Sequence, residues 1–130
     1  MVALDTNVYI YFLEKNSKFY NTAEKAIKYA LTSGPICVPV ITFMEIRSGA
    51  PNSMEIIDFF ANPQFDVHDF TASLAILAGE LMYIHKSLKL ADAIYLATAL
   101  ENRAHQFVTN DSRLANLKLD IEIVPLARFQ

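Results

Sequence analysis

Four acidic residues are the candidates for carboxylate chemistry in this sequence. They are Asp5, Glu45, Asp92 and Asp111. Each is predicted to lie where a strand ends and a helix begins. In a parallel sheet these junctions share one edge, so acids that are distant in sequence are expected to converge there. Converging carboxylates repel one another and are tolerated only when protons or cations neutralise them.

A hard divalent cation would neutralise such a cluster. Mg²⁺ and Mn²⁺ prefer oxygen ligands, and carboxylates supply them. The four acids therefore predict a metal-dependent enzyme, and phosphate chemistry is the natural reaction class. A net charge of −3 argues against binding nucleic acid through overall positive charge, but bound divalent ions would invert the local field.

Each acid also has an ordinary structural explanation. Thr42 and Glu45 have the spacing of a capping box, and Asp111 fits an N-cap. Asp92 suits the dipole of a first helical turn, and Asp5 could open the helix that follows it. Capping does not explain why four acids meet at one edge, and an unpaired acid at Asp92, in an otherwise apolar helix, is costly. The set therefore predicts a metal site in which Asp5 and Asp92 are the best ligands.

The elements that must position these acids follow from apolar periodicity. The sequence predicts strands at 2–4, 36–41, 65–67, 107–109 and 121–124. It predicts helices at 8–13, 22–31, 42–47, 54–60, 71–85, 91–103 and 112–117, with a break at 48–52. Alternating strands and helices predict an α/β fold, a three-layer α/β/α sandwich with a mostly parallel central sheet. Residues 1–130 are expected to form a single domain.

Composition narrows the setting in which this domain works. Hydrophobic residues make up 53% of the chain, which predicts either an unusually full core or a subunit or partner interface. The lone Cys37 excludes an internal disulfide and fits a reducing compartment. No apolar run reaches the roughly 18–20 residues of a membrane span, and the N-terminus does not resemble a signal peptide. A cytoplasmic protein without a membrane partner is expected.

Other chemical groups give weaker signals. The three histidines and one cysteine show no zinc-ligand spacing, and the three glycines are isolated, so no phosphate-binding glycine loop is predicted. Arg47 and Arg113 flank the acids in sequence and are candidate substrate contacts through phosphate. A solvated surface role explains either arginine equally well.

Four short motifs together carry a family resemblance. They are Leu4-Asp5-Thr6-Asn7, Ile41-Thr42-Phe43-Met44-Glu45 followed by Gly49, Leu90-Ala91-Asp92-Ala93-Ile94 leading into Ala97-Thr98-Ala99, and Val108-Thr109-Asn110-Asp111. In this order and spacing they resemble a PIN domain, and the total length is similar to that of the VapC-type toxins of prokaryotic toxin–antitoxin pairs. The resemblance covers essentially the whole chain.

The resemblance implies a ribonuclease whose matching acids, Asp5, Glu45, Asp92 and Asp111, bind Mg²⁺ or Mn²⁺. It implies that Thr6, Asn7 and Thr109 help to shape the site, and that the products carry a 5′-phosphate and a 3′-hydroxyl. It further implies an RNA substrate, a small antitoxin protein as partner, and a homodimer. The chain departs from the family at Leu114, where an aromatic residue is usual, and it lacks a further acid nearby. Whether one or two ions bind is therefore left open.

Two alternatives use the same fold class. A phosphotransfer protein, either a receiver or a phosphatase, would also place an aspartate after its first strand. The phosphatases need a second aspartate two places on, where this chain has Asn7, and the phosphoacceptor aspartate and later lysine of a receiver are not found. A binding module that has lost its chemistry is the other alternative, and the presence of all four acids argues against it.

Overall fold

The computed structural model describes residues 1–49 and 53–130 and shows a five-stranded sheet in which every pairing is parallel. The strand order is β3-β2-β1-β4-β5. The strands are β1 (Val2–Leu4), β2 (Ile36–Pro39), β3 (Phe65–His68), β4 (Gln106–Thr109) and β5 (Glu122–Pro125). Because β2 and β3 lie on one side of β1 and β4 and β5 on the other, the winding direction reverses beside β1. The carboxyl ends of β1 and β4 meet at this switch point, where open α/β sheets bind ligands.

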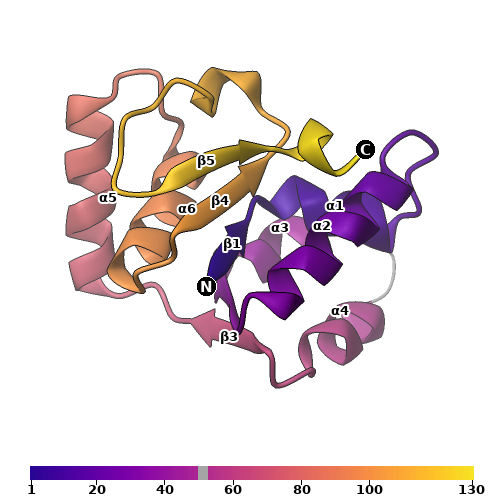
Figure 1. Cartoon of the computed structure of the whole chain (residues 1–130). Helices are drawn as coiled ribbons and strands as arrows, with labels where there is room; N and C mark the ends of the chain where they lie inside the picture. Colours follow the sequence, from indigo (N-terminus) through magenta and orange to yellow (C-terminus); the bar gives the residue numbers. More distant parts are fainter. Residues whose placement is uncertain (50–52) are drawn as a thin grey trace.

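Helices cover both faces of the sheet (Figure 1). One layer contains α1 (Thr6–Leu13), α2 (Tyr20–Thr32), α3 (Ile41–Gly49) and α4 (Ser53–Phe60), together with the terminal 3₁₀ helix η2 (Leu126–Phe129). The opposite layer contains α5 (Ala72–Ile84) and α6 (Leu90–Glu101). A further 3₁₀ helix, η1 (Ser112–Leu114), follows β4. The predicted three-layer α/β/α sandwich is confirmed.

The side chains of the central strand β1 pack alternately into the two hydrophobic cores, one on each face of the sheet. Val2 and Leu4 of β1 belong to the core under α1 and α2, whereas Ala3 between them belongs to the core under α5 and α6. Successive side chains of a strand point to opposite faces. A strand buried on both faces must therefore be apolar at every position, as the run Val2-Ala3-Leu4 is.

Most element boundaries lie within two residues of the predicted ones, and the differences have local causes. The first helix begins at Thr6 rather than Val8, because the carboxylate of Asp5 accepts the backbone N–H of Asn7 and caps it there. The second strand ends at Pro39 and not at residue 41, and a strand end is a position where proline is tolerated. The segment predicted as a helix over 112–117 forms only the 3₁₀ turn η1. The predicted break at 48–52 lies partly outside the described residues, and α3 continues through its first two positions, Ser48 and Gly49.

Within the part of the chain that the structure describes, no helix has the length and apolar character needed to cross a membrane.

Candidate active site

The structure places the four predicted acids on four different elements. Asp5 directly follows β1, and Asp111 follows β4 after one intervening residue. The prediction that every acid ends a strand is wrong for the other two. Glu45 lies inside α3, and Asp92 lies in the first turn of α6, which follows α5 without a strand between them. Strand ends therefore supply two of the acids, the middle of α3 supplies Glu45, and the first turn of α6 supplies Asp92.

Asp5 is buried and held from several directions. Its residue surface is only 6% exposed, and its backbone N–H donates to the carbonyl of Val108 at 2.9 Å, which ties the ends of β1 and β4 together. The Thr109 hydroxyl donates to Asp5 Oδ2 at 2.7 Å, and the Asn7 backbone N–H donates to Oδ1 at 3.4 Å. Asp5 therefore has a fixed orientation before any ligand binds.

Glu45 is oriented by a threonine rather than by capping. The Thr6 hydroxyl donates to Glu45 Oε1 at 3.3 Å, and the hydroxyls of Thr6 and Thr42 are 3.1 Å apart. The predicted capping box of Thr42 and Glu45 is wrong, because α3 begins one residue earlier, at Ile41, and Thr42 lies within the helix. The predicted supporting role of Thr6 has a physical basis here, since it links α1 to the Glu45 carboxylate.

Asp92 and Asp111 share an arginine. Asp92 is 8% exposed, and its Oδ2 accepts both the Lys89 backbone N–H and Arg113 Nη2, each at 3.1 Å. Arg113 Nη2 also donates to Asp111 Oδ2 at 2.5 Å. Asp111 caps η1 as expected, because its Oδ1 accepts the Arg113 backbone N–H at 2.9 Å. Asp111 thus has the structural role predicted for it as well as a place among the acids.

The charges of neighbouring acids act on Asp5 and Glu45. Burial raises the pKa of Asp5, and the charges of Asp92 and Asp111 add to that rise. Burial also raises the pKa of Glu45, with further contributions from Asp5 and Asp92. For Asp111 the effect of burial is outweighed by hydrogen bonds from Arg113, which lower its pKa. The ionised forms of Asp5 and Glu45 are therefore disfavoured, and a bound cation would stabilise them.

We expect the free energy of unfolding of the metal-free protein to fall as pH rises from about 4 toward neutrality. This fall should be less steep in the Asp5→Asn variant than in the parent. A carboxyl group with a raised folded-state pKa stabilises the fold below its ordinary value, 3.8 for Asp5 and 4.5 for Glu45. That stability is lost as pH rises through the folded value. Urea unfolding in EDTA across this range measures the slope. Asp111, whose pKa is lowered, has the opposite effect on stability, but it is present in both proteins and does not affect the comparison. Equal slopes of the free energy of unfolding against pH for the parent and Asp5→Asn would contradict the expectation.

The donor set fits a hard divalent ion, although its present arrangement does not enclose one. All four groups are carboxylates, which Mg²⁺ and Mn²⁺ prefer, and their mutual pKa effects place them within electrostatic reach. Among the residues that the structure describes, no three acids, histidines or cysteines are grouped closely enough to hold a metal as they stand. The guanidinium of Arg113 lies between two of the acids instead. Asp5, Asp92, Glu45 and Asp111 are the residues that would hold an ion.

The two candidate phosphate contacts have different surroundings. Arg113 contacts the acids themselves, which the sequence did not predict. Arg47 lines an apolar pocket of about 390 Å³ on the α3–α4 layer. Its other lining residues are Phe43, Ile56, Ile57, Phe60 and Val67. The structure therefore joins Arg113 to the acidic cluster and shows Arg47 at a different surface feature.

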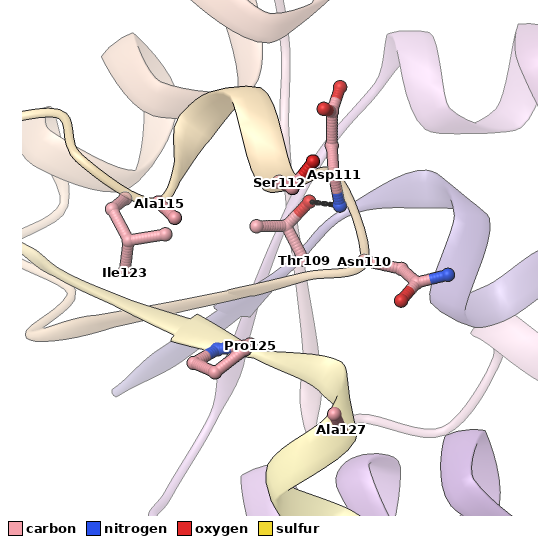
Figure 2. A pocket seen from close by; sticks show the side chains of 8 residues that line it. All are labelled: Thr109, Asn110, Asp111, Ser112, Ala115, Ile123, Pro125 and Ala127. Carbon is pink, nitrogen blue, oxygen red and sulfur yellow. Dashed lines mark hydrogen bonds between the residues drawn. The ribbon is translucent and has the colours of Figure 1, made fainter.

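A second pocket, of about 410 Å³, lies directly beside Asp111 (Figure 2). Thr109 borders it, and the hydroxyl of Thr109 accepts the Asp111 backbone N–H at 3.0 Å, so the pocket adjoins the acidic cluster. The carboxylate of Asp111 points away from the apolar side of the pocket in this view. The sequence did not predict this apolar side, because apolar residues carry no chemical signature. Only the position of these residues could have indicated it, since they follow β4, lie on β5 or follow β5. Its residues are Ala115, Ile123, Pro125 and Ala127.

Comparisons with known proteins identify the family and support the fold. The family model described as PIN domain matches residues 2–119. Curated proteins gave no match. Among solved structures, a toxin–antitoxin complex from Klebsiella pneumoniae is similar at 27% identity and a TM-score of 0.69, covering 95% of this chain and 100% of that one.

Two further structures are similar in fold at lower identity. VapBC2 from Rickettsia felis, bound to a DNA fragment from its promoter, has a TM-score of 0.74 at 18% identity and covers 96% of this chain and 98% of that one. VapC20 from Mycobacterium tuberculosis, a toxin that cleaves the sarcin–ricin loop, has a TM-score of 0.69 at 16% identity and covers 94% and 99%.

Proposed function

The chain belongs to the PIN domain family, and from this premise we propose that it is a divalent-metal-dependent endoribonuclease, the toxin of a toxin–antitoxin pair. The observation that carries the proposal is electrostatic coupling among the acids near the sheet's switch point. Burial raises the pKa of Asp5 and of Glu45, the charge of Asp92 raises both further, and Asp111 adds to the rise at Asp5. The solved toxin structures support the same reading, since their whole chains align with this one.

In this proposal, acidic side chains of the chain itself are the metal ligands. Asp5 and Asp92 are the proposed principal ligands because both are buried and held by hydrogen bonds. Asp5 accepts one from Thr109 of β4, and Asp92 accepts one from the backbone N–H of Lys89 at the start of its own helix. Glu45, half-buried and hydrogen-bonded to Thr6, and Asp111 complete the set. When bound, a divalent ion would lower the pKa of a water molecule and offset charge on the phosphate. We propose Thr6, Asn7 and Thr109 as the groups that orient the ligands.

RNA cleavage by the purified protein tests the proposal. Structured and unstructured RNAs are incubated with Mn²⁺, with Mg²⁺ or with EDTA, and the new ends are sequenced. We expect cleavage only with a divalent ion, leaving 5′-phosphate and 3′-hydroxyl ends. Cleavage that persists in EDTA would contradict metal dependence. Binding of Mn²⁺ without cleavage of any RNA would instead favour the inactive binding module, and covalent labelling of Asp5 by a phosphate analogue would favour phosphotransfer.

Exposed apolar side chains supply surfaces for the proposed partners. The pocket lined by Arg47 and Ile57, with exposed Met44 nearby on α3, is the proposed contact for an antitoxin segment.

A second exposed apolar face lies on α5, where Ile76, Tyr83 and Ile84 are exposed, and we propose this face for a homodimer. Patches of this kind on a small protein usually mark interaction sites. The solution mass of the chain, alone and with the product of an adjacent short reading frame, tests both assignments.

A further inference from the structure

The guanidinium of Arg113 makes three contacts that converge on the acidic cluster. Nη2 donates to Asp92 Oδ2 at 3.1 Å and to Asp111 Oδ2 at 2.5 Å, and Nη1 donates to the backbone carbonyl of Ser87 at 3.0 Å. Three partners from two segments of the chain, Ser87 and Asp92 before and in α6 and Asp111 before η1, thus hold one planar cation. Such bridging is characteristic of arginine, whose fork of N–H donors matches carboxylate geometry.

We propose that Arg113 is the built-in counter-cation of the metal-free site, and that it competes with the divalent ion for the oxygens of Asp92 and Asp111. This inference rests on the proposed function for the identity of the ligands. It goes beyond that function by assigning to the chain itself a cation that lowers its affinity for metal.

Geometry makes the two cations mutually exclusive at these atoms. The oxygens that face Arg113 Nη2 are Oδ2 of Asp92 and Oδ2 of Asp111. A bound Mg²⁺ would need carboxylate oxygens at about 2.0–2.1 Å. A guanidinium bridging the same two oxygens occupies the space between them and repels a second cation. This arrangement is consistent with the finding that, among the described residues, no three acids are grouped closely enough to hold a metal, since Asp92 and Asp111 face an arginine.

Arg113 is placed so that it can leave. It lies in η1, only two residues after Asp111, and its side chain is 37% exposed. The backbone hydrogen bond from Arg113 to Asp111 Oδ1 does not involve the guanidinium, so the side chain can turn into solvent while η1 stays capped. Asp5 and Glu45 accept hydrogen bonds from the hydroxyls of Thr109 and Thr6, and those contacts do not depend on Arg113.

Calorimetric titration with Mn²⁺ tests the proposal in Arg113→Gln. We expect this variant to bind Mn²⁺ about three- to tenfold more tightly than the parent, because an exposed charge-assisted pair contributes modestly. Arg113→Lys keeps the charge but lacks the planar fork, and its affinity should lie between the two. Without metal, Arg113→Gln should melt below the parent, since Asp92 and Asp111 lose their shared cation, and saturating Mn²⁺ should narrow that difference.

Arg128→Gln is the matched control. Arg128 donates to Glu122 Oε1 at 3.2 Å on the surface, so its removal changes the net charge equally without touching the four acids. Its affinity for Mn²⁺ should equal the parent's. Equal or weaker binding by Arg113→Gln, or an equal gain in Arg128→Gln, would overturn the competition.

The outcomes for the inference and for the proposed function are distinguishable. Equal Mn²⁺ binding by parent and Arg113→Gln would reject the competition and leave the metal-dependent nuclease standing. Binding by Arg113→Gln alone would support both, because the parent's own arginine would then be what keeps the metal out. Absence of binding in both would reject the inference together with the metal site, and circular dichroism would verify that each variant is folded.

Discussion

Asp5→Asn is expected to lower RNA cleavage by more than about 100-fold while the protein keeps its fold. Loss of a group that merely orients a metal ligand costs about 10–100-fold. Asp5 is the buried acid at the switch point and a proposed ligand itself, so its loss should cost more. Asparagine has the same shape and can still accept the hydrogen bond from Thr109, which keeps the junction between β1 and β4 intact. Cleavage rates of a labelled RNA under saturating Mn²⁺ give the measurement.

Stability separates a lost ligand from a lost fold. Because burial raises the pKa of Asp5, its charge is unfavourable near neutral pH, and the neutral amide should leave the metal-free protein as stable as the parent or more so. Asp69→Asn, an exposed acid between β3 and α5, is the matched control and should cut RNA at the parent's rate. A folded Asp5→Asn protein with the parent's cleavage rate would refute the proposed role of Asp5.

The fold was predictable because each strand carries its own signal. The runs Val2-Ala3-Leu4 and Phe107-Val108 are apolar on both faces, as is typical of strands of a covered parallel sheet. Parallel pairing of β1 with β4 then brings Asp5 and Asp111 to the same edge, although they are far apart in sequence. Glu45 and Asp92 approach that edge from α3 and α6, so the expectation that each acid ends a strand is wrong for these two, while their role as ligands stays a prediction.

The contacts among side chains were not predictable in the same way. The hydrogen bond from Thr6 to Glu45 joins residues 39 apart, and the pair of Arg113 with Asp92 joins residues 21 apart. No periodic pattern in the sequence predicts either contact, because each depends on how two helices are placed relative to each other over the sheet. Arg113 is the clearest case, since its position beside the acids suggested a phosphate contact, whereas in the structure its partners are the acids themselves.

Thr109→Val is expected to lower cleavage by about 10–100-fold, although Thr109 is not a proposed ligand. Its hydroxyl donates to Asp5 Oδ2 at 2.7 Å and accepts the Asp111 backbone N–H at 3.0 Å, so one buried group orients two acids. Valine keeps the shape and removes both bonds. Leaving these partners unsatisfied should also lower the free energy of unfolding by about 1–3 kcal/mol. Cleavage rates and urea unfolding measure the two effects.

A pH profile distinguishes orientation of Asp5 from simple loss of stability. The hydrogen bond from Thr109 lowers the pKa of Asp5 against the larger effect of burial, so its removal should raise that pKa further. The acid limb of the cleavage profile should therefore move to higher pH in Thr109→Val, because Asp5 must ionise to act as a ligand. Thr109→Ser retains the hydroxyl and should keep the parent's profile. A Thr109→Val enzyme that is slower at every pH, with its acid limb unmoved, would show that Thr109 supports the fold without tuning Asp5.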